Sequence, residues 1–168
     1  MSLQYAKVSR FECSDPYEIA HTIALNALVT RAKSKGELLA HLKTRGVEED
    51  IAQAVLFRLQ ESGLVNDREF ALAWAKSRHD HKKISKRIIA GELRQKGVTQ
   101  EFIDEALEAI DDESEYRSAF DLGFKKYNTM SRLAPDVQVR RIQSLLRRKG
   151  FGFSIISRVL RELDLSER

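Results

Sequence analysis

The stretch SKGELLAHLKTRGVEEDIAQAVLFRL, residues 34–59, has the apolar spacing of two helices joined by a glycine turn. Apolar residues recur at intervals of three, four and seven on both sides of Gly46, as they do along one face of a helix. A glycine followed by an apolar residue is typical of a helix end in the left-handed backbone region. Ser34 with Glu37 three residues later is a capping box, which indicates that the first helix begins there.

The same pattern occurs twice more without gaps, as SKRIIAGELRQKGVTQEFIDEALEAI (85–110) and QVRRIQSLLRRKGFGFSIISRVLREL (138–163). The turn glycines coincide as Gly46, Gly97 and Gly150. Ser85 and Thr99 stand where helix N-caps are expected. Because internal repeats at a fixed period define the architecture, the three frames predict three tandem modules.

A further helix is expected ahead of each pair. Asp15-Pro16 with Glu18 marks one start, and Asn66 with Glu69 marks another. We therefore predict an all-α fold of three tandem three-helix, helix-turn-helix-like repeats that form an elongated, curved array. An N-terminal arm is expected at residues 1–14, and the repeats at residues 15–65, 66–112 and 113–168. The inner faces of the leading helices are predicted to consist of Ile19, Ile23, Leu28, Phe70, Ala71, Trp74, Phe120, Phe124 and Tyr127, with the aromatic pairs in the core and not on a binding surface.

Composition fits a folded protein outside the secretory and membrane classes. The chain has 168 residues, 42% of them hydrophobic, and two prolines. A single cysteine, Cys13, has no cysteine partner for a disulfide or a zinc site, which favours a reducing compartment. The sequence contains no apolar run of signal-peptide or membrane-spanning type, so we expect a cytoplasmic protein without membrane contact.

Catalytic and cofactor motifs do not stand out. The sequence lacks a phosphate-binding loop, a dinucleotide fingerprint and an H-E-x-x-H zinc motif, so no enzymatic activity and no cofactor are expected. His79 and His81 have an unfavourable i, i+2 spacing for metal binding on a helix. The acidic run Asp111, Asp112, Glu113 and Glu115 is expected to be a helix-terminal cap or a partner-facing patch.

Charge is distributed in blocks along the chain, although the formal net charge is only +4. Residues 76–97 carry 8 Lys and Arg against 2 Asp and Glu, residues 98–116 carry none against 8, and residues 117–168 carry 12 against 5. Such blocks suit a polyanion or a partner with complementary patches, but they are also compatible with ordinary solvated helix faces.

Basic residues recur at equivalent positions of the repeats, at the end of the second helix of each module. One position holds Lys43, Arg94 and Arg147, and another holds Arg45, Lys96 and Lys149. Cations there can simply stabilise a helix C-terminus, but the chain has more of them than capping needs. The predicted partner- or DNA-binding patch comprises Lys82, Lys83, Lys86, Arg87, Arg94, Lys96, Arg140, Arg141, Arg147, Arg148 and Lys149, with phosphate contact favoured over base readout.

Four motifs resemble the RecX family of regulators of the bacterial recombinase RecA. They are R-x-x-S-x-x-E-L-x-x-x-L (31–42), G-L-V-N-D-R-E-F-A (63–71), E-L-R-Q-K-G-V (92–98) and L-L-R-R-K-G-F (145–151). The resemblance extends over about residues 17–163. It implies a non-catalytic protein that binds the RecA nucleoprotein filament, with secondary contacts to single-stranded DNA. It also implies inhibition of RecA ATPase, filament extension and strand exchange, and so a role in DNA recombination and repair. We expect the protein to be a monomer.

Two other functions stay open at this point. A DNA-binding protein with tandem helix-turn-helix modules is one alternative, and a helical scaffold for an unrelated partner is another.

Overall fold

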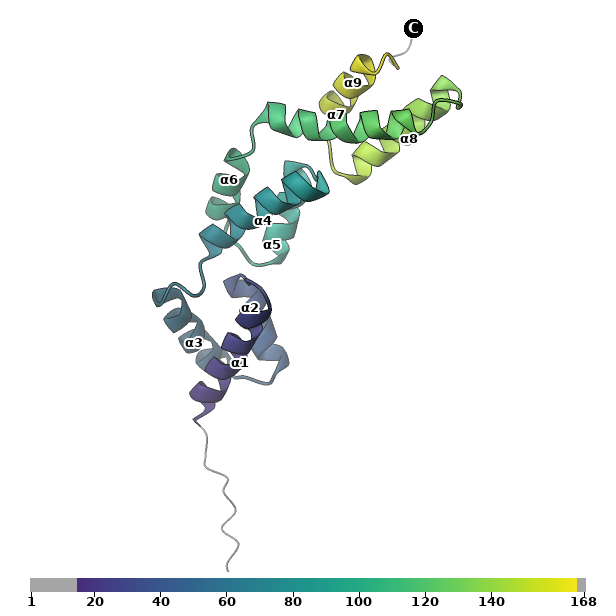
Figure 1. Ribbon diagram of the computed structural model, residues 1–168. Coiled ribbons are helices and arrows are strands. Elements are labelled where there is room, and N and C mark those ends of the chain that lie inside the picture. Colours follow the sequence, from purple (N-terminus) through teal and green to yellow (C-terminus); the bar gives the residue numbers. More distant parts are fainter. Residues whose placement is uncertain (1–14, 166–168) are drawn as a thin grey trace, which may run out of the picture. The chain divides into compact units, whose positions relative to one another are not determined.

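The computed structural model describes residues 15–165, which form nine α-helices and no strand within that range (Figure 1). The predicted arm at 1–14, with Cys13, lies outside the described residues. None of the described helices is long and apolar enough to cross a membrane. The prediction of an all-α protein built from three-helix repeats is confirmed, and contacts divide the chain into two compact units.

The first unit contains residues 37–65 and the chain up to residue 33. Its helices are α1 (Pro16–Thr30), most of α2 (Lys35–Thr44) and α3 (Glu49–Glu61). Its core is formed by apolar residues of all three helices and the turn after α3, namely Ala20, Ala24, Ala27, Leu38, Leu42, Ala52, Val55, Leu56, Leu59 and Val65.

The second unit contains residues 34–36 and everything from Asn66 onward. Helices α4 (Asp67–Lys82), α5 (Lys86–Gln95) and α6 (Gln100–Glu108) enclose one core. Helices α7 (Asp112–Asn128), α8 (Pro135–Arg148) and α9 (Phe153–Glu162) enclose another. His79 of α4 connects the two groups, because its Nε2 lies 3.0 Å from Ser114 Oγ and 3.3 Å from Ser118 Oγ in α7.

The glycine turns have the predicted backbone. Gly46, Gly97 and Gly150 have φ values of +79°, +75° and +88°, in the left-handed region. Each therefore ends a helix in the conformation that glycine adopts without steric cost.

The start signals are confirmed at two of the predicted places. The side chain of Asp15 accepts a hydrogen bond from the Tyr17 amide, and that of Asn66 accepts from the amides of Arg68 and Glu69. Ser85 and Thr99 precede α5 and α6 as predicted, but neither side chain makes a capping hydrogen bond to the helix that it precedes. A group from another helix supplies the cap of α5, as described below.

The prediction of the inner faces was wrong for two large residues. Ile19 is 48% exposed and Phe124 is 47% exposed. Small residues occupy the innermost positions of the leading helices instead, in the pairs Ala20 and Ala24, Ala71 and Ala75, and Ala119 and Gly123. The reason is close helix approach: a Cβ on Gly123 would lie 2.7 Å from Val159 Cγ1 in α9.

Candidate polyanion-binding surface

The beginning of α5 is fixed by groups of α7 and of the turn after α8. The Lys86 amide donates to Glu115 Oε1 at 2.9 Å, and Lys86 Nζ lies 2.8 Å from Asp112 Oδ1. This hydrogen bond from Lys86 Nζ holds the pKa of the Asp112 carboxyl below its usual range. Since the first amides of a helix have no partner within it, a carboxylate at this point both accepts a hydrogen bond and complements the helix dipole. Within the acidic run, Glu115 therefore caps α5, and Asp111 accepts from the Ser114 amide at the start of α7, which is one of the two predicted roles; Asp112 and Glu113 pair with basic side chains.

The turn after α8 completes this junction. The Ser85 amide donates to the Lys149 carbonyl at 3.0 Å, and Lys149 Nζ donates to the Lys82 carbonyl at 2.7 Å. Arg87 Nε donates to the Gly150 carbonyl at 3.3 Å. We call this set of contacts the α5 junction. Lys86, Arg87 and Lys149, three residues of the predicted patch, therefore have structural partners here.

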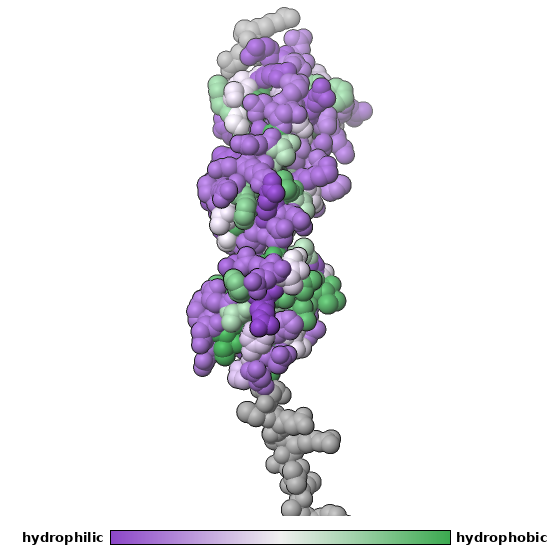
Figure 2. Space-filling view, turned by 90° about the vertical axis from the view of Figure 1, so that its left-hand side faces the viewer, coloured by the Kyte–Doolittle hydropathy of each residue, from purple (hydrophilic) through white to green (hydrophobic). Residues whose placement is uncertain are grey.

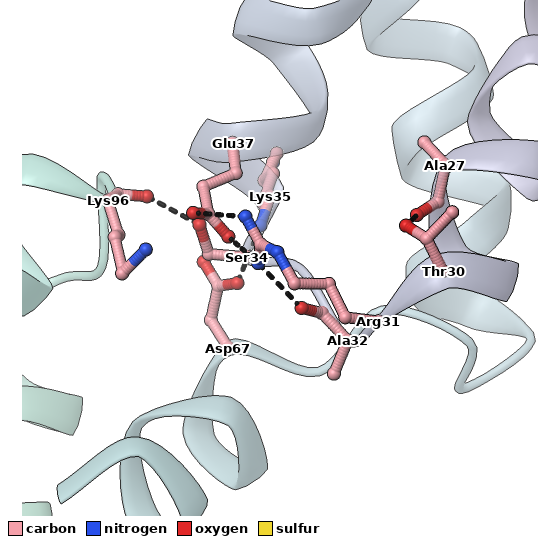
Figure 3. A network of polar contacts seen from close by, with 9 residues as sticks. All are labelled: Ala27, Thr30, Arg31, Ala32, Ser34, Lys35, Glu37, Asp67 and Lys96. Atoms are coloured by element: carbon pink, nitrogen blue, oxygen red, sulfur yellow. Dashed lines mark hydrogen bonds and ion pairs between the residues drawn. The ribbon is translucent and has the colours of Figure 1, made fainter. Parts of the chain in front are cut away.

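A second junction of the same kind lies at residues 34–36 of the second unit (Figure 3). Ser34 Oγ donates to the Lys96 carbonyl at 2.5 Å, and the Lys35 amide donates to Asp67 Oδ1 at 2.7 Å. In both junctions, a serine before a helix donates a hydrogen bond to the carbonyl of the residue before a turn glycine. A carboxylate then accepts a hydrogen bond from the amide of the residue that follows the serine. The serines, the lysines that follow them and the lysines that supply the carbonyls stand at equivalent places of the repeat, whereas Asp67 is the first residue of α4 and Glu115 the fourth of α7.

Lys96, another residue of the predicted patch, packs on aromatic rings. Its Nζ lies 4.0 Å from the centre of the Trp74 ring and 5.9 Å from that of Phe70, which are cation–π distances. Trp74 Nε1 donates to Glu92 at 2.8 Å, and Arg78 pairs with the same carboxylate. Trp74 is therefore part of a partly buried polar cluster.

The remaining residues of the second repeat differ in their surroundings. Lys83 Nζ lies 3.5 Å from Asp121 in α7. Lys82 and Arg94 are exposed, and Arg94 Nε donates to Gln100 Oε1 at 3.1 Å.

The third repeat gathers exposed arginines on one helix. Arg140, Arg141, Arg147 and Arg148 are all exposed on α8, whose buried side carries Ile142 and Leu146. A shallow groove of about 530 Å³ lies along the exposed side. We call it the α8 groove; its lining residues are Lys126, Val137, Arg140, Arg141, Ser144 and Arg148.

Lys126 is a basic lining residue that the sequence did not indicate. It comes from α7, outside the aligned repeat frames, and only the packing of α7 against α8 brings it to the groove. Its position in the last turn of α7 gave the sequence no reason to separate it from an ordinary helix-end cation.

Acidic residues dominate the exposed side of α6, the second helix of the second helix-turn-helix. Glu101, Asp104 and Glu108 are exposed there. A helix with this charge is unsuited to entering a DNA groove, because the phosphates on both sides repel it. Within residues 15–165, no group of three or more His, Cys, Asp and Glu side chains is placed to hold a metal ion.

Fold and surface together define a tandem helical-repeat protein with a basic groove on its last repeat. Family models of RecX match all three repeats: the first three-helix domain at residues 20–59, the second at 66–107 and the third at 112–160. The chain belongs to the RecX family, a family of regulatory proteins and not of enzymes.

Curated relatives named "Regulatory protein RecX" match the sequence of this chain over most of their length. The protein of Streptomyces coelicolor is 38% identical over 148 residues, 88% of this chain and 79% of that protein. The protein of Amycolatopsis mediterranei is 35% identical over 150 residues, 87% of this chain and 86% of that protein.

Solved structures support the fold. The crystal structure of RecX from Lactobacillus salivarius matches with a TM-score of 0.80 at 24% identity, covering 90% of this chain and 98% of that one. A second crystal structure of regulatory protein RecX matches with a TM-score of 0.79 at 21% identity, covering 95% and 80%.

Proposed function

We propose that this protein is a non-catalytic regulator that binds the RecA filament on single-stranded DNA. In this proposal it inhibits RecA ATPase, filament extension and strand exchange, and so modulates recombination and DNA repair. The observation that carries the proposal is the match of all three RecX domain models between residues 20 and 160.

The repeat architecture supports binding to a polymer. A filament presents the same surface at regular intervals, and three similar modules in one chain can contact several of its subunits. Because each further contact forms within one complex, weak contacts combine into strong binding by effective concentration. We propose that modules at residues 15–65, 66–112 and 113–168 act in this way, in a monomer in the cytoplasm.

The basic residues supply the second type of contact in this proposal. Of the predicted patch, Lys82, Arg94 and the four arginines of α8 are the best placed to meet the filament or its DNA, because their side chains are exposed. The other members have structural contacts in the two junctions, with Asp121 or against Trp74. Base readout by tandem helix-turn-helix modules is disfavoured by the acidic exposed side of α6.

An ATPase measurement tests the proposal. RecA is assembled with ATP on single-stranded DNA, and hydrolysis is followed as this protein is added; we expect it to slow. Binding to the filament and to the same DNA without RecA is measured in parallel. Equal binding to bare DNA and filament, together with unchanged ATPase, would show that the protein is a DNA-binding protein and not a RecA regulator.

A further inference from the structure

We propose that the α8 groove is a binding site for the phosphodiester backbone of nucleic acid, and that it binds without regard to base sequence. This deepens the proposed function by assigning the DNA contacts to one surface. It rests on that function only for the source of the nucleic acid, since binding at the groove itself requires no RecA.

The basic side chains of the groove are spaced along one helix. Arg141 precedes Arg148 by seven residues, so the two are separated by about 10 Å at 1.5 Å per residue. Ser144 lies between them, and Arg140 and Lys126 of α7 line the groove with them. Four cations and a hydroxyl group therefore line one open surface that can follow a strand past more than one phosphate.

Ion pairing leaves most of this charge available. Among the described residues, the one ion pair found for the arginines of α8 joins Arg140 to Asp136 at 3.0 Å, and both side chains are more than two-thirds exposed. Such an exposed i, i+4 pair contributes little and is easily exchanged for a phosphate. The second repeat contrasts with this, because Lys83 and Lys86 pair with acids of α7 there.

The chemistry of the lining favours a phosphate backbone over an acidic protein segment. Guanidinium groups bind phosphate oxygens with two parallel hydrogen bonds, and a serine hydroxyl can donate to another. A protein interface of useful affinity needs buried apolar or aromatic anchors, yet Val137 is the only apolar residue among the described residues that line the groove. This described lining also includes no aromatic ring on which bases can stack, which predicts contact to the backbone alone.

The test measures binding of the full chain to a fluorescent oligothymidylate and to a duplex of equal length, over a range of salt concentrations. The variant is Arg141→Gln with Arg148→Gln. Because each phosphate contact contributes about 0.7 to the salt slope on a single strand and about 0.9 on a duplex, losing two should lower the slope by about 1.4 or 1.8. Affinity at low salt should fall about tenfold or more.

Two matched variants serve as controls. Arg45→Gln with Arg58→Gln makes the same change in net charge at exposed positions of the first unit and should bind like the parent. Arg141→Lys with Arg148→Lys keeps the charge, so the salt slope should be preserved while affinity falls less. If the glutamine variant of α8 binds no more weakly than the Arg45 and Arg58 variant, the proposal is wrong. Equal competition by polyglutamate, compared per charge, would also overturn it in favour of an acidic protein partner.

RecA ATPase measured on the same variants separates this inference from the proposed function. Loss of oligonucleotide binding with inhibition retained supports the groove as a nucleic-acid site and places the inhibitory contacts elsewhere. Normal oligonucleotide binding by the glutamine variant overturns the groove assignment whatever happens to inhibition. A parent protein that binds oligonucleotide through the groove but never slows RecA supports the groove and refutes the proposed function.

Discussion

Replacing Gly150 with alanine should destabilise the second unit for two reasons that the structure separates. The residue has φ +88°, where a side chain costs about 1–2 kcal/mol relative to glycine. A new Cβ would also overlap Ser85 Oγ and lie 2.6 Å from Ile88 Cγ1 at the α5 junction. Ser85 is 1% exposed, so displacement of these groups should cost about 1–3 kcal/mol more, as overpacking does elsewhere.

Gly46→Ala isolates the backbone contribution. Gly46 has φ +79°, but no described atom outside its own turn lies within 4 Å of the point that an added Cβ would occupy. Its alanine variant should therefore lose only about 1–2 kcal/mol. Hydrogen exchange read peptide by peptide measures both losses in the unit where each occurs. Equal losses for the two variants would refute the close packing of the α5 junction.

A double variant identifies the atom responsible. Ser85 Oγ is buried without a hydrogen-bond partner among the described residues, so Ser85→Ala alone should cost little. Combined with Gly150→Ala, it should recover part of the steric loss, because the closest clash is removed. Additive losses in this cycle would show that Ser85 does not limit the space at Gly150.

Four further variants have expected outcomes in the second unit. Leu93→Ala, at a fully buried position, should lower the free energy of unfolding by about 2–5 kcal/mol in urea titrations followed by Trp74 fluorescence. Arg94→Glu should weaken RecA inhibition with an unchanged unfolding midpoint, whereas Lys96→Glu should shift Trp74 emission because its cation lies on that ring. Burial lowers the pKa of His79 below its usual value, so the unfolded state binds this proton more readily than the folded state. Stability should therefore decline as pH falls below about 6.5, and His79→Gln should lessen that decline in midpoints measured from about pH 8 to about pH 5.

The sequence predicted the turns and the helix pairs of this fold because their signals are local. A glycine at φ > 0 followed by an apolar residue, as at Gly97-Val98, needs no knowledge of distant contacts. Because this pattern occurs three times at equivalent positions, each predicted turn supports the prediction of the other two.

The packing of the leading helices could not be predicted in the same way. Apolar periodicity places Phe120 and Phe124 on one stripe, and their rings do stack with centroids 5.8 Å apart. The helices approach through Ala119 and Gly123, however, so the larger rings lie to one side and Phe124 is left 47% exposed. Hydrophobicity ranks phenylalanine above glycine, whereas a close helix crossing selects the smaller residue. Figure 2 also shows hydrophobic (green) surface on the first unit. The exposed large hydrophobic residues of that unit are Ile19, Val29, Phe57 and Leu64.

Contacts between residues far apart in the chain decide which basic residues of the predicted patch have structural partners and which are free to bind. Lys86 and Lys149 are ordinary surface cations by sequence, yet Lys86 pairs with an acid 26 residues away and Lys149 donates to a carbonyl 67 residues away. No local pattern distinguishes such residues from Arg141 or Arg148. Only the structure shows which charges hold the repeats together and which face outward.

Comparison of equivalent positions in the aligned repeats explains why the groove lies on the third repeat and not on the second. Arg141 occupies the position of Ile88 in the second repeat, and Ile88 lies directly against Gly150 at the α5 junction. Ile88 is partly buried, and a charged side chain at its position would lose this apolar packing. The equivalent place on α8 is exposed, so arginine is tolerated there and can be used for binding. Two of the lining arginines, Arg141 and Arg148, therefore stand where the third repeat departs from Ile88 and Gln95 of the second, whereas Arg140 corresponds to Arg87.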